Sequence, residues 1–203
     1  MSYKSENIFW NKGKVTAEER ALQNGHPGCI VWLTGLSGSG KTTLATELER
    51  ELFNRGKHAY VLDGDNMRHG LGSDLAFSPH DRKENIRRAG EVAKLLADAG
   101  IICITAFISP YRSDRELARA IAPVGKFLEI YLNAPLEVCE KRDPKGLYAK
   151  ARAGMIKDFT GISAPYEAPL NPELELRTDQ HNVGECISTI LERLDLVAAS
   201  LRK

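Results

Sequence analysis

The sequence predicts an α/β fold in which a five-stranded parallel sheet carries helices on both faces. Short apolar runs rich in β-branched residues alternate with longer segments of helical period, which is typical of repeated strand–helix–strand units. Most of these runs are apolar throughout, as expected of strands that are covered on both sides. A chain of 203 residues also has the length of one domain.

Five runs are the candidate strands. They are residues 29–34, 58–62, 101–108, 127–132 and 174–176. Ser78, Pro79 and Asp81 supply an N-cap, a proline at the first helical position and an acid in the first turn. The helix that they begin is expected to run to about Ala99. Apolar residues recur at three and four residue steps across residues 183–197, which indicates a final helix against the core.

Two segments lack a sustained period. Residues 154–172 contain three prolines and two glycines, so we expect a long loop of the kind that often serves as a lid. Residues 1–27 are polar enough to form a partly ordered N-terminal arm. The folded domain is therefore expected to span residues 28–203.

The composition disfavours several classes of protein. Lys and Arg total 28 against 27 Asp and Glu, and a net charge of +1 gives no bulk attraction to nucleic acid or an anionic membrane. The N-terminus lacks a continuous apolar segment of signal-peptide length, and the longest nearly apolar run of the chain is far too short to cross a bilayer, so we expect a cytoplasmic protein. The cysteines lack CxxC spacing and the histidines lack HExxH spacing, which indicates reduced, mostly buried thiols and no zinc site.

The stretch GLSGSGKT, residues 35–42, fits the P-loop pattern GxxxxGK[ST] between an expected strand and an expected helix. Missing side chains let backbone N–H groups converge on phosphate oxygens, and the start of the helix adds partial positive charge. Lys41 is expected to reach the β- and γ-phosphates, and Thr42 to ligate Mg²⁺. The pattern predicts a P-loop NTPase fold. The predicted nucleotide-binding residues are Gly35, Leu36, Ser37, Gly38, Ser39, Gly40, Lys41, Thr42 and Thr43.

A GTPase switch is disfavoured, because no Asn-Lys-x-Asp motif is present to read guanine. The second expected strand ends in Asp63-Gly64-Asp65, which places two carboxylates at the edge of the sheet where ligands bind. One of them can approach the metal or an acceptor hydroxyl while the other positions the substrate. The alternative interpretation is a turn that caps a helix.

Five further segments follow GLSGSGKTT in a specific order. They are DGDNMRHGL, FSPHDRKENIRRAGEVA, FISPYR, RDPKGLYAKARAG and FTGISAPYEAP. Together they resemble the adenylylsulfate kinase (APS kinase) family over about residues 5–195. The resemblance implies a P-loop kinase that transfers the γ-phosphoryl group of ATP, with magnesium, to the 3′-hydroxyl of adenosine 5′-phosphosulfate. The product would be PAPS, the activated donor of sulfate assimilation. Relatives are commonly homodimers.

The resemblance also implies where the acceptor nucleotide binds. Arg68, Arg82 and Asn85 match positions that hold the phosphosulfate and ribose, and arginine offers bidentate geometry to an oxyanion. Phe77 would stack on the adenine, opposite Tyr166. The alternative is that Arg82 is a solvated helix charge and Phe77 a core residue.

Asp63 looks like the carboxylate that orients the acceptor hydroxyl and accepts its proton, and Asp65 like a substrate-binding partner. Lys145 would meet the charge that develops on the transferred group. The family's serine at Ser109 has been assigned as a phosphoryl-enzyme intermediate. No histidine lies near it in sequence to activate the hydroxyl, and direct in-line transfer needs no covalent step, so Ser109 and Ile108 are expected to contact substrate.

Arg152 is expected to pack on the ATP adenine or to close the lid, and Thr178 to flank that base. The remaining residues expected at the substrate are Leu147, Gly161 and Ile162. Two other functions stay open at this point. One is a P-loop kinase for a sugar acid or a nucleoside monophosphate, which would lack the FISP and DPKGLY segments. The other is a regulatory module that senses ATP without turnover, which the paired acids disfavour.

Overall fold

The computed structural model describes residues 7–9 and 11–200, so residues 1–6 and 10 of the expected arm lie outside the described residues. Within the described part, five parallel strands form one sheet in the order β2-β3-β1-β4-β5. The strands are β1 (Cys29–Thr34), β2 (Ala59–Asp63), β3 (Ile102–Ala106), β4 (Phe127–Leu132) and β5 (Leu174–Leu176). The predicted sheet is confirmed, although β3 is shorter at both ends than its apolar run.

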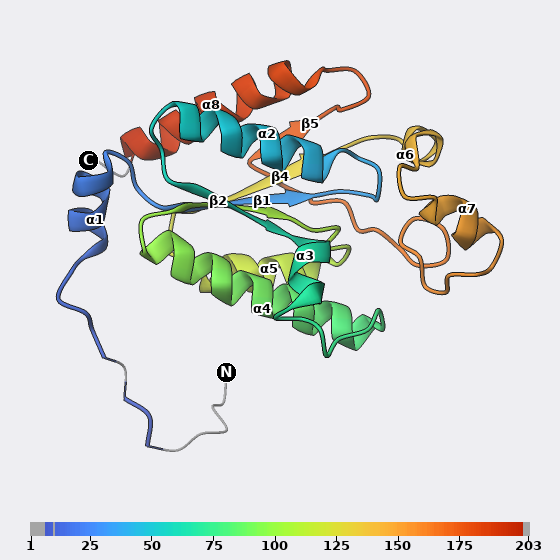
Figure 1. The fold of residues 1–203 in the computed structure, drawn as a ribbon, viewed down its shortest axis with the longest axis horizontal. Helices are drawn as coiled ribbons and strands as arrows, with labels where there is room; N and C mark the ends of the chain where they lie inside the picture. The colour runs from blue at the N-terminus through green and yellow to red at the C-terminus, as the bar shows by residue number, and fades with distance from the viewer. Residues whose placement is uncertain (1–6, 10, 201–203) are drawn as a thin grey trace.

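Helices cover both faces of the sheet (Figure 1). The helices α2 (Lys41–Asn54) and α8 (Val183–Ser200) lie on one face, and α4 (Pro79–Asp98) and α5 (Arg112–Ile121) lie on the other. Strand β1 is buried at every position, because its alternate side chains enter the two cores. Val31 joins the α2 and α8 side, whereas Ile30 and Trp32 join the α4 side. A central strand that is buried on both faces has a continuous apolar run in its sequence.

The start of α4 is formed as the sequence predicts. Ser78 Oγ accepts the backbone N–H of Asp81 at 3.1 Å, and Pro79 occupies the first turn, where its missing N–H costs no helical hydrogen bond. Gly90 lies where α4 meets α5, and a Cβ there would lie 3.1 Å from Ile121 Cδ1. The missing side chain at Gly90 therefore lets α4 and α5 pack closely on their face of the sheet.

Four helices are not among the elements expected by residue range. They are α1 (Ala17–Asn24), α5, α6 (Leu136–Arg142) and α7 (Leu147–Arg152). The short helix α3 (Gly64–His69) has Asp63 as its N-cap, as the helix-cap interpretation expects. In Figure 1, α6 and α7 lie beyond the carboxyl ends of the strands, while α1 lies near the opposite end of the sheet. Asn24 Nδ2 donates to the Gly100 carbonyl at 3.2 Å, which ties α1 to the body of the domain.

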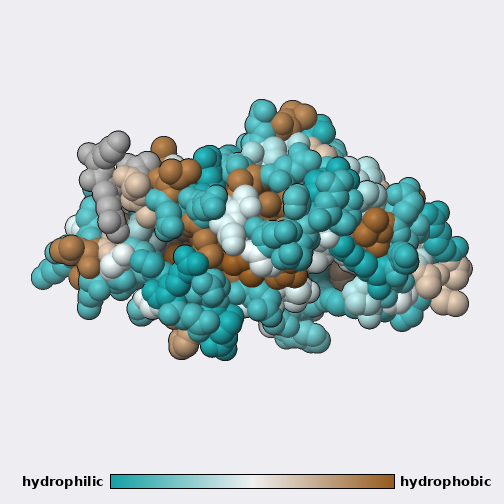
Figure 2. Space-filling model, turned by 90° about the horizontal axis from the view of Figure 1, so that it is seen from above, coloured by the Kyte–Doolittle hydropathy of each residue, from teal (hydrophilic) through white to brown (hydrophobic). Residues whose placement is uncertain are grey.

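Residues 154–172 contain no helix and no regular strand, as expected of a long loop. Because this loop borders the cleft described below, we call residues 154–172 the lid segment. The four cysteines are free and buried, as predicted. The face shown in Figure 2 is mostly hydrophilic, and its apolar side chains gather in separate groups. Among the described residues, no helix combines the length and the apolar character that crossing a membrane requires.

Candidate functional site

A cleft of about 1500 Å³ opens at the carboxyl edge of the sheet. Strand β1 lies between β3 and β4, so the strand order reverses where β1 ends. Open α/β sheets bind ligands at such a switch point. The P-loop begins there, and the ends of β2 and β3 and part of the lid segment line the same cleft. The topology therefore collects the sequence motifs at one place.

The backbone of the P-loop requires glycine at Gly38. Its φ is +75°, in the left-handed region, and a Cβ at this position would lie only 2.8 Å from the carbonyl oxygen of Cys139. The loop can therefore lie directly on α6 only because this side chain is missing. The turn leads into α2, whose first residue is Lys41.

Lys41 lies inside the loop rather than on the surface. Lys41 is only 8% exposed, and its Nζ donates to the carbonyls of Gly35 at 3.0 Å and Leu36 at 2.8 Å. Burial lowers the pKa of Lys41 to about 8. The ammonium group is thereby held at the centre of the phosphate-binding loop.

The two carboxylates after β2 have separate partners. Asp63 Oδ1 caps α3 by accepting the backbone N–H groups of Asp65 at 2.9 Å and Asn66 at 3.4 Å. Asp63 Oδ2 accepts the hydroxyl of Thr42 at 2.8 Å. The helix-cap interpretation and the functional one are thus compatible, because one oxygen caps the helix and the other faces the P-loop. Asp65 forms an ion pair with Lys145, which brings the DPKGLY segment to this side of the cleft.

The predicted acceptor residues gather at the α4 side of the cleft. Phe77 is 61% exposed, so it is not a core residue, and the Arg68 guanidinium lies 4.3 Å from its ring centroid. Arg82 donates from Nη1 to Thr160 Oγ1 at 3.0 Å and from Nη2 to the Asp158 carbonyl at 2.7 Å. Arg82 is therefore a link between α4 and the lid segment and not a solvated charge.

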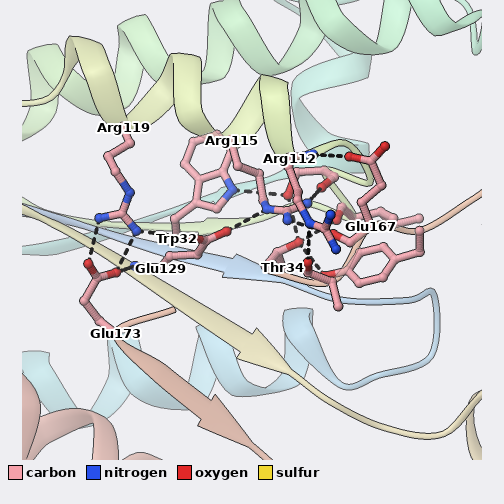
Figure 3. A network of polar contacts seen from close by, with 12 residues as sticks. Trp32, Thr34, Arg112, Arg115, Arg119, Glu129, Glu167 and Glu173 are labelled. Atoms are coloured by element: carbon pink, nitrogen blue, oxygen red, sulfur yellow. Dashed lines mark hydrogen bonds and ion pairs between the residues drawn. The ribbon is translucent and has the colours of Figure 1, made fainter. Parts of the chain in front are cut away.

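Asn85 and Ser109 are both buried residues that line the cleft. Asn85 Oδ1 has no hydrogen-bond partner among the described residues, which is costly for a buried acceptor and typical of a ligand-binding position. The Ser109 hydroxyl accepts Trp32 Nε1–H at 3.2 Å and donates to Thr34 Oγ1 at 3.0 Å (Figure 3). Ser109 thus gives its proton to another hydroxyl and not to a base. Ile108 lines the cleft beside it.

The structure does not place Tyr166 opposite Phe77. The Tyr166 ring stacks on Tyr131 with centroids 5.8 Å apart, and its hydroxyl lies 2.9 Å from Thr34 Oγ1. Tyr166 is absent from the residues that line the cleft, because these contacts hold its ring against residues of β1 and β4. Arg152 is also outside the lining and pairs with Glu140 at 2.8 Å.

The other predicted residues fall into two groups. Leu147 and Thr178 line the cleft. Gly161 and Ile162 lie outside the lining, next to the Leu36 side chain, and a Cβ on Gly161 would lie 3.0 Å from Leu36 Cδ2. These two residues therefore hold the lid segment against the side of the P-loop that faces away from the cleft.

Two residues with P-loop contacts were not assigned from the sequence, although both lie in the RDPKGLYAKARAG segment. Arg142 Nη1 donates to the Gly38 carbonyl at 3.3 Å, and the Tyr148 hydroxyl donates to the Ser37 carbonyl at 2.9 Å. The RDPKGLYAKARAG segment indicated that this region belongs to the site. Its residue pattern does not show which backbone carbonyl each side chain reaches.

A buried ionic network fixes the end of the lid segment (Figure 3). Arg115 of α5 is 2% exposed and donates to Glu129 Oε1 at 2.6 Å, to the Ser109 carbonyl at 2.7 Å and to the Glu167 carbonyl at 2.7 Å. Arg119 pairs with Glu129 and, at 2.7 Å, with Glu173. The network joins the wall of the cleft at Ser109 to the lid segment at Glu167.

No cluster of three or more His, Cys, Asp or Glu side chains exists among the described residues to bind a metal ion by itself. The Thr42 hydroxyl and the Asp63 carboxylate are hard oxygen donors, which suit Mg²⁺ when nucleotide phosphates and water complete the coordination. The donor set therefore fits a magnesium ion that arrives with a nucleotide.

A P-loop at the switch point of a parallel sheet, with a carboxylate against its threonine, is the arrangement of P-loop nucleotide-binding enzymes. The family model for adenylylsulphate kinase matches residues 27–177. The adenylyl-sulfate kinase of Staphylococcus haemolyticus is 60% identical over 190 residues, covering 94% of this chain and 96% of its own. The chain therefore belongs to the adenylylsulphate kinase family.

Solved structures agree with this assignment. The Mycobacterium tuberculosis APS kinase CysC, in complex with AMPPNP and APS, has a TM-score of 0.80 and 48% identity, covering 84% of this chain and 99% of that chain. The hexameric APS kinase from Thiobacillus denitrificans has a TM-score of 0.65 and 33% identity, covering 88% of this chain and 31% of that chain.

Proposed function

We propose that this chain transfers the γ-phosphoryl group of MgATP to the 3′-hydroxyl of adenosine 5′-phosphosulfate, giving PAPS for sulfate assimilation. The observation that carries the proposal is the 2.8 Å contact between Asp63 Oδ2 and Thr42 Oγ1. It puts a carboxylate that can orient an acceptor hydroxyl directly against the loop that binds the donor phosphates. The relatives named for this activity support the choice of acceptor.

On the donor side, the P-loop amides and the Lys41 ammonium would bind the β- and γ-phosphates. Thr42 would ligate Mg²⁺, and Asp63 would contact it through water. The ion would neutralise phosphate charge and hold the γ-phosphoryl group in line with the acceptor. Thr178, which lines the cleft beside the loop, would flank the ATP base.

On the acceptor side, the exposed Phe77 ring would stack on the adenine, and Arg68 and Arg82 would bind the phosphosulfate. The buried Asn85 Oδ1 would accept a hydroxyl of the ribose, which would supply the partner that it lacks within the protein. The Ile108 and Ser109 segment would form the floor beneath the sugar.

In the transfer step, the 3′-oxygen forms a bond to the γ-phosphorus while the bond to the ADP oxygen breaks. The hydroxyl proton passes to the Asp63 carboxylate as the new bond forms. Lys145 leaves its ion pair with Asp65 and contacts the charged oxygens of the transferred group, while Asp65 then contacts the acceptor. Alignment and charge neutralisation supply most of the rate in this chemistry.

The test is a transfer assay on the purified protein. ATP and adenosine 5′-phosphosulfate should yield ADP and PAPS, and Lys41→Met should abolish the product while the far-ultraviolet circular dichroism spectrum stays unchanged. Gluconate and AMP serve as competing acceptors. Preferential phosphorylation of either would show a different small-molecule kinase, and ATP binding without transfer to any acceptor would show a sensing module.

We further propose a cytoplasmic homodimer, with residues 1–27 as an arm beside a kinase domain of residues 28–203. The hexameric relative shows that oligomers occur in the family. Phe9 and Leu22 of the arm are 91% and 86% exposed, and a second copy would cover such apolar side chains. Four free, buried thiols suit a reducing compartment. Light scattering of the full chain would contradict the dimer if it gave the mass of one chain.

A further inference from the structure

Three consecutive carbonyl groups of the P-loop accept hydrogen bonds from side chains that lie outside the loop. The bonds run from Tyr148 Oη to the Ser37 carbonyl (2.9 Å), from Arg142 Nη1 to the Gly38 carbonyl (3.3 Å) and from Thr178 Oγ1 to the Ser39 carbonyl (2.9 Å). The donors come from α7, from α6 and from the turn after β5. The outer side of the loop is thus bonded to three separate elements of the C-terminal half.

These bonds determine which way the peptide N–H groups point. In a planar trans peptide, the carbonyl of one residue and the N–H of the next point to opposite sides. Carbonyls of Ser37 and Ser39 that point outward therefore turn the N–H groups of Gly38 and Gly40 inward, toward the phosphate cradle. Within the described residues, neither of these amides donates to a protein acceptor, whereas Ser39 N–H donates to the Leu36 carbonyl at 3.1 Å.

Tyr148 is the most firmly held of the three donors. It is buried, and its ring packs edge-on against Phe159 with centroids 5.0 Å apart. Burial also raises the pKa of Tyr148, so its hydroxyl keeps its proton at any working pH. Arg142, by contrast, is exposed and makes the longest of the three bonds.

We propose that Tyr148 is a positioning residue for nucleotide phosphates: its hydroxyl fixes the Ser37–Gly38 peptide so that the Gly38 N–H faces the phosphate chain. Tyr148 touches no substrate and acts through the loop backbone. The inference rests on the proposed function only in taking the bound nucleotide to be ATP.

The test compares Tyr148→Phe with the wild type by isothermal titration calorimetry. Phenylalanine keeps the ring against Phe159 and removes only the hydroxyl. The dissociation constant of MgATP is expected to rise roughly three- to tenfold, the range that corresponds to one hydrogen bond. The dissociation constant of adenosine 5′-phosphosulfate is expected to stay unchanged, because its proposed site does not use the Gly38 amide.

Tyr131→Phe is the matched control. It also removes a tyrosine hydroxyl, whose bond goes to Asn133 Oδ1 at 3.3 Å and not to the P-loop. This variant should bind both nucleotides as the wild type does. As a second readout, the ¹⁵N–¹H signal of Gly38 should shift on addition of MgADP in the wild type and shift less in Tyr148→Phe, which a purely structural role would not produce.

An unchanged MgATP dissociation constant in folded Tyr148→Phe would overturn the inference, as would equal weakening of both nucleotides together with a large fall in the thermal midpoint. If Tyr148→Phe does not fold, the wild type decides the question: the ¹⁵N–¹H signal of Gly38 must shift on addition of MgADP for the inference to survive. A wild type that binds MgATP but transfers nothing to adenosine 5′-phosphosulfate would refute the proposed function. It would leave the inference about Tyr148 intact, because that inference is tested by the MgATP titrations.

Discussion

Replacing Asp63 with asparagine separates the two roles that the structure gives this side chain. Oδ1 caps α3 and Oδ2 faces Thr42. Asparagine is as good an N-cap as aspartate, so the free energy of unfolding should change by less than about 0.5 kcal/mol. The amide cannot take a proton or supply negative charge. We therefore expect kcat to fall by roughly 10²- to 10⁴-fold, which is about 3–5 kcal/mol of transition-state stabilisation.

The assay measures kcat and the two KM values at saturating MgATP and adenosine 5′-phosphosulfate, with urea unfolding in parallel. Asp63→Ala should lose the same activity and also about 1 kcal/mol of stability, because the cap is gone. Thr16→Ala is the matched control, since it removes the N-cap of α1 far from the cleft and should lower stability without lowering kcat. Asp63→Asn with kcat within about threefold of the wild type would show that Asp63 only caps a helix.

Two further predictions concern stability. Arg115→Met should cost about 3–5 kcal/mol in urea unfolding, because it leaves the Glu129 carboxylate, in a residue only 5% exposed, with Arg119 as its remaining ionic partner. The double variant with Glu129→Gln should recover part of that loss, and a loss under about 1 kcal/mol would contradict the argument. His26 Nε2 accepts the His58 N–H at 2.9 Å, and burial lowers the pKa of His26 from its usual 6.5. The unfolded chain then binds the proton more tightly, so stability is full above about pH 6.5 and is lost as the pH falls through the lowered pKa. The thermal midpoint should fall between pH 6.5 and 5 in the wild type and fall less in His26→Gln, and equal slopes would contradict this account.

The elements that the sequence predicts well are those whose signal is local. Strand β1 is apolar at every position because both of its faces are buried, and the start of α4 is marked by Ser78 and Pro79 themselves. The short helices α6 and α7 have no such signal. They are stabilised by packing of buried side chains such as Cys139 and Tyr148 against Phe159 of the lid segment, contacts that no local pattern contains.

The same distinction explains the site residues. The P-loop and Asp63 sit at strand ends, so the order of the elements alone brings them together. Tyr166 lies in a long loop whose path depends on Arg115 of α5. The Arg115 guanidinium donates to the carbonyl of Glu167, which is 52 positions later in the chain and next to Tyr166. A buried ionic network of this kind is built by tertiary packing, so the sequence could indicate the lid segment but not where its tyrosine points.

The segment that follows α6 connects the donor and acceptor sides of the cleft. Asp143 accepts the backbone N–H groups of Leu147 at 2.8 Å and Ala149 at 3.2 Å, so the turn and the start of α7 form one unit. Lys145 of this unit pairs with Asp65, and Tyr148 bonds the P-loop at Ser37. Because Lys145 and Tyr148 lie three positions apart in this unit, we expect a displacement of the turn to alter both contacts together. In the proposed mechanism, the geometry of phosphate binding and the geometry of transfer therefore both depend on the turn that leads into α7.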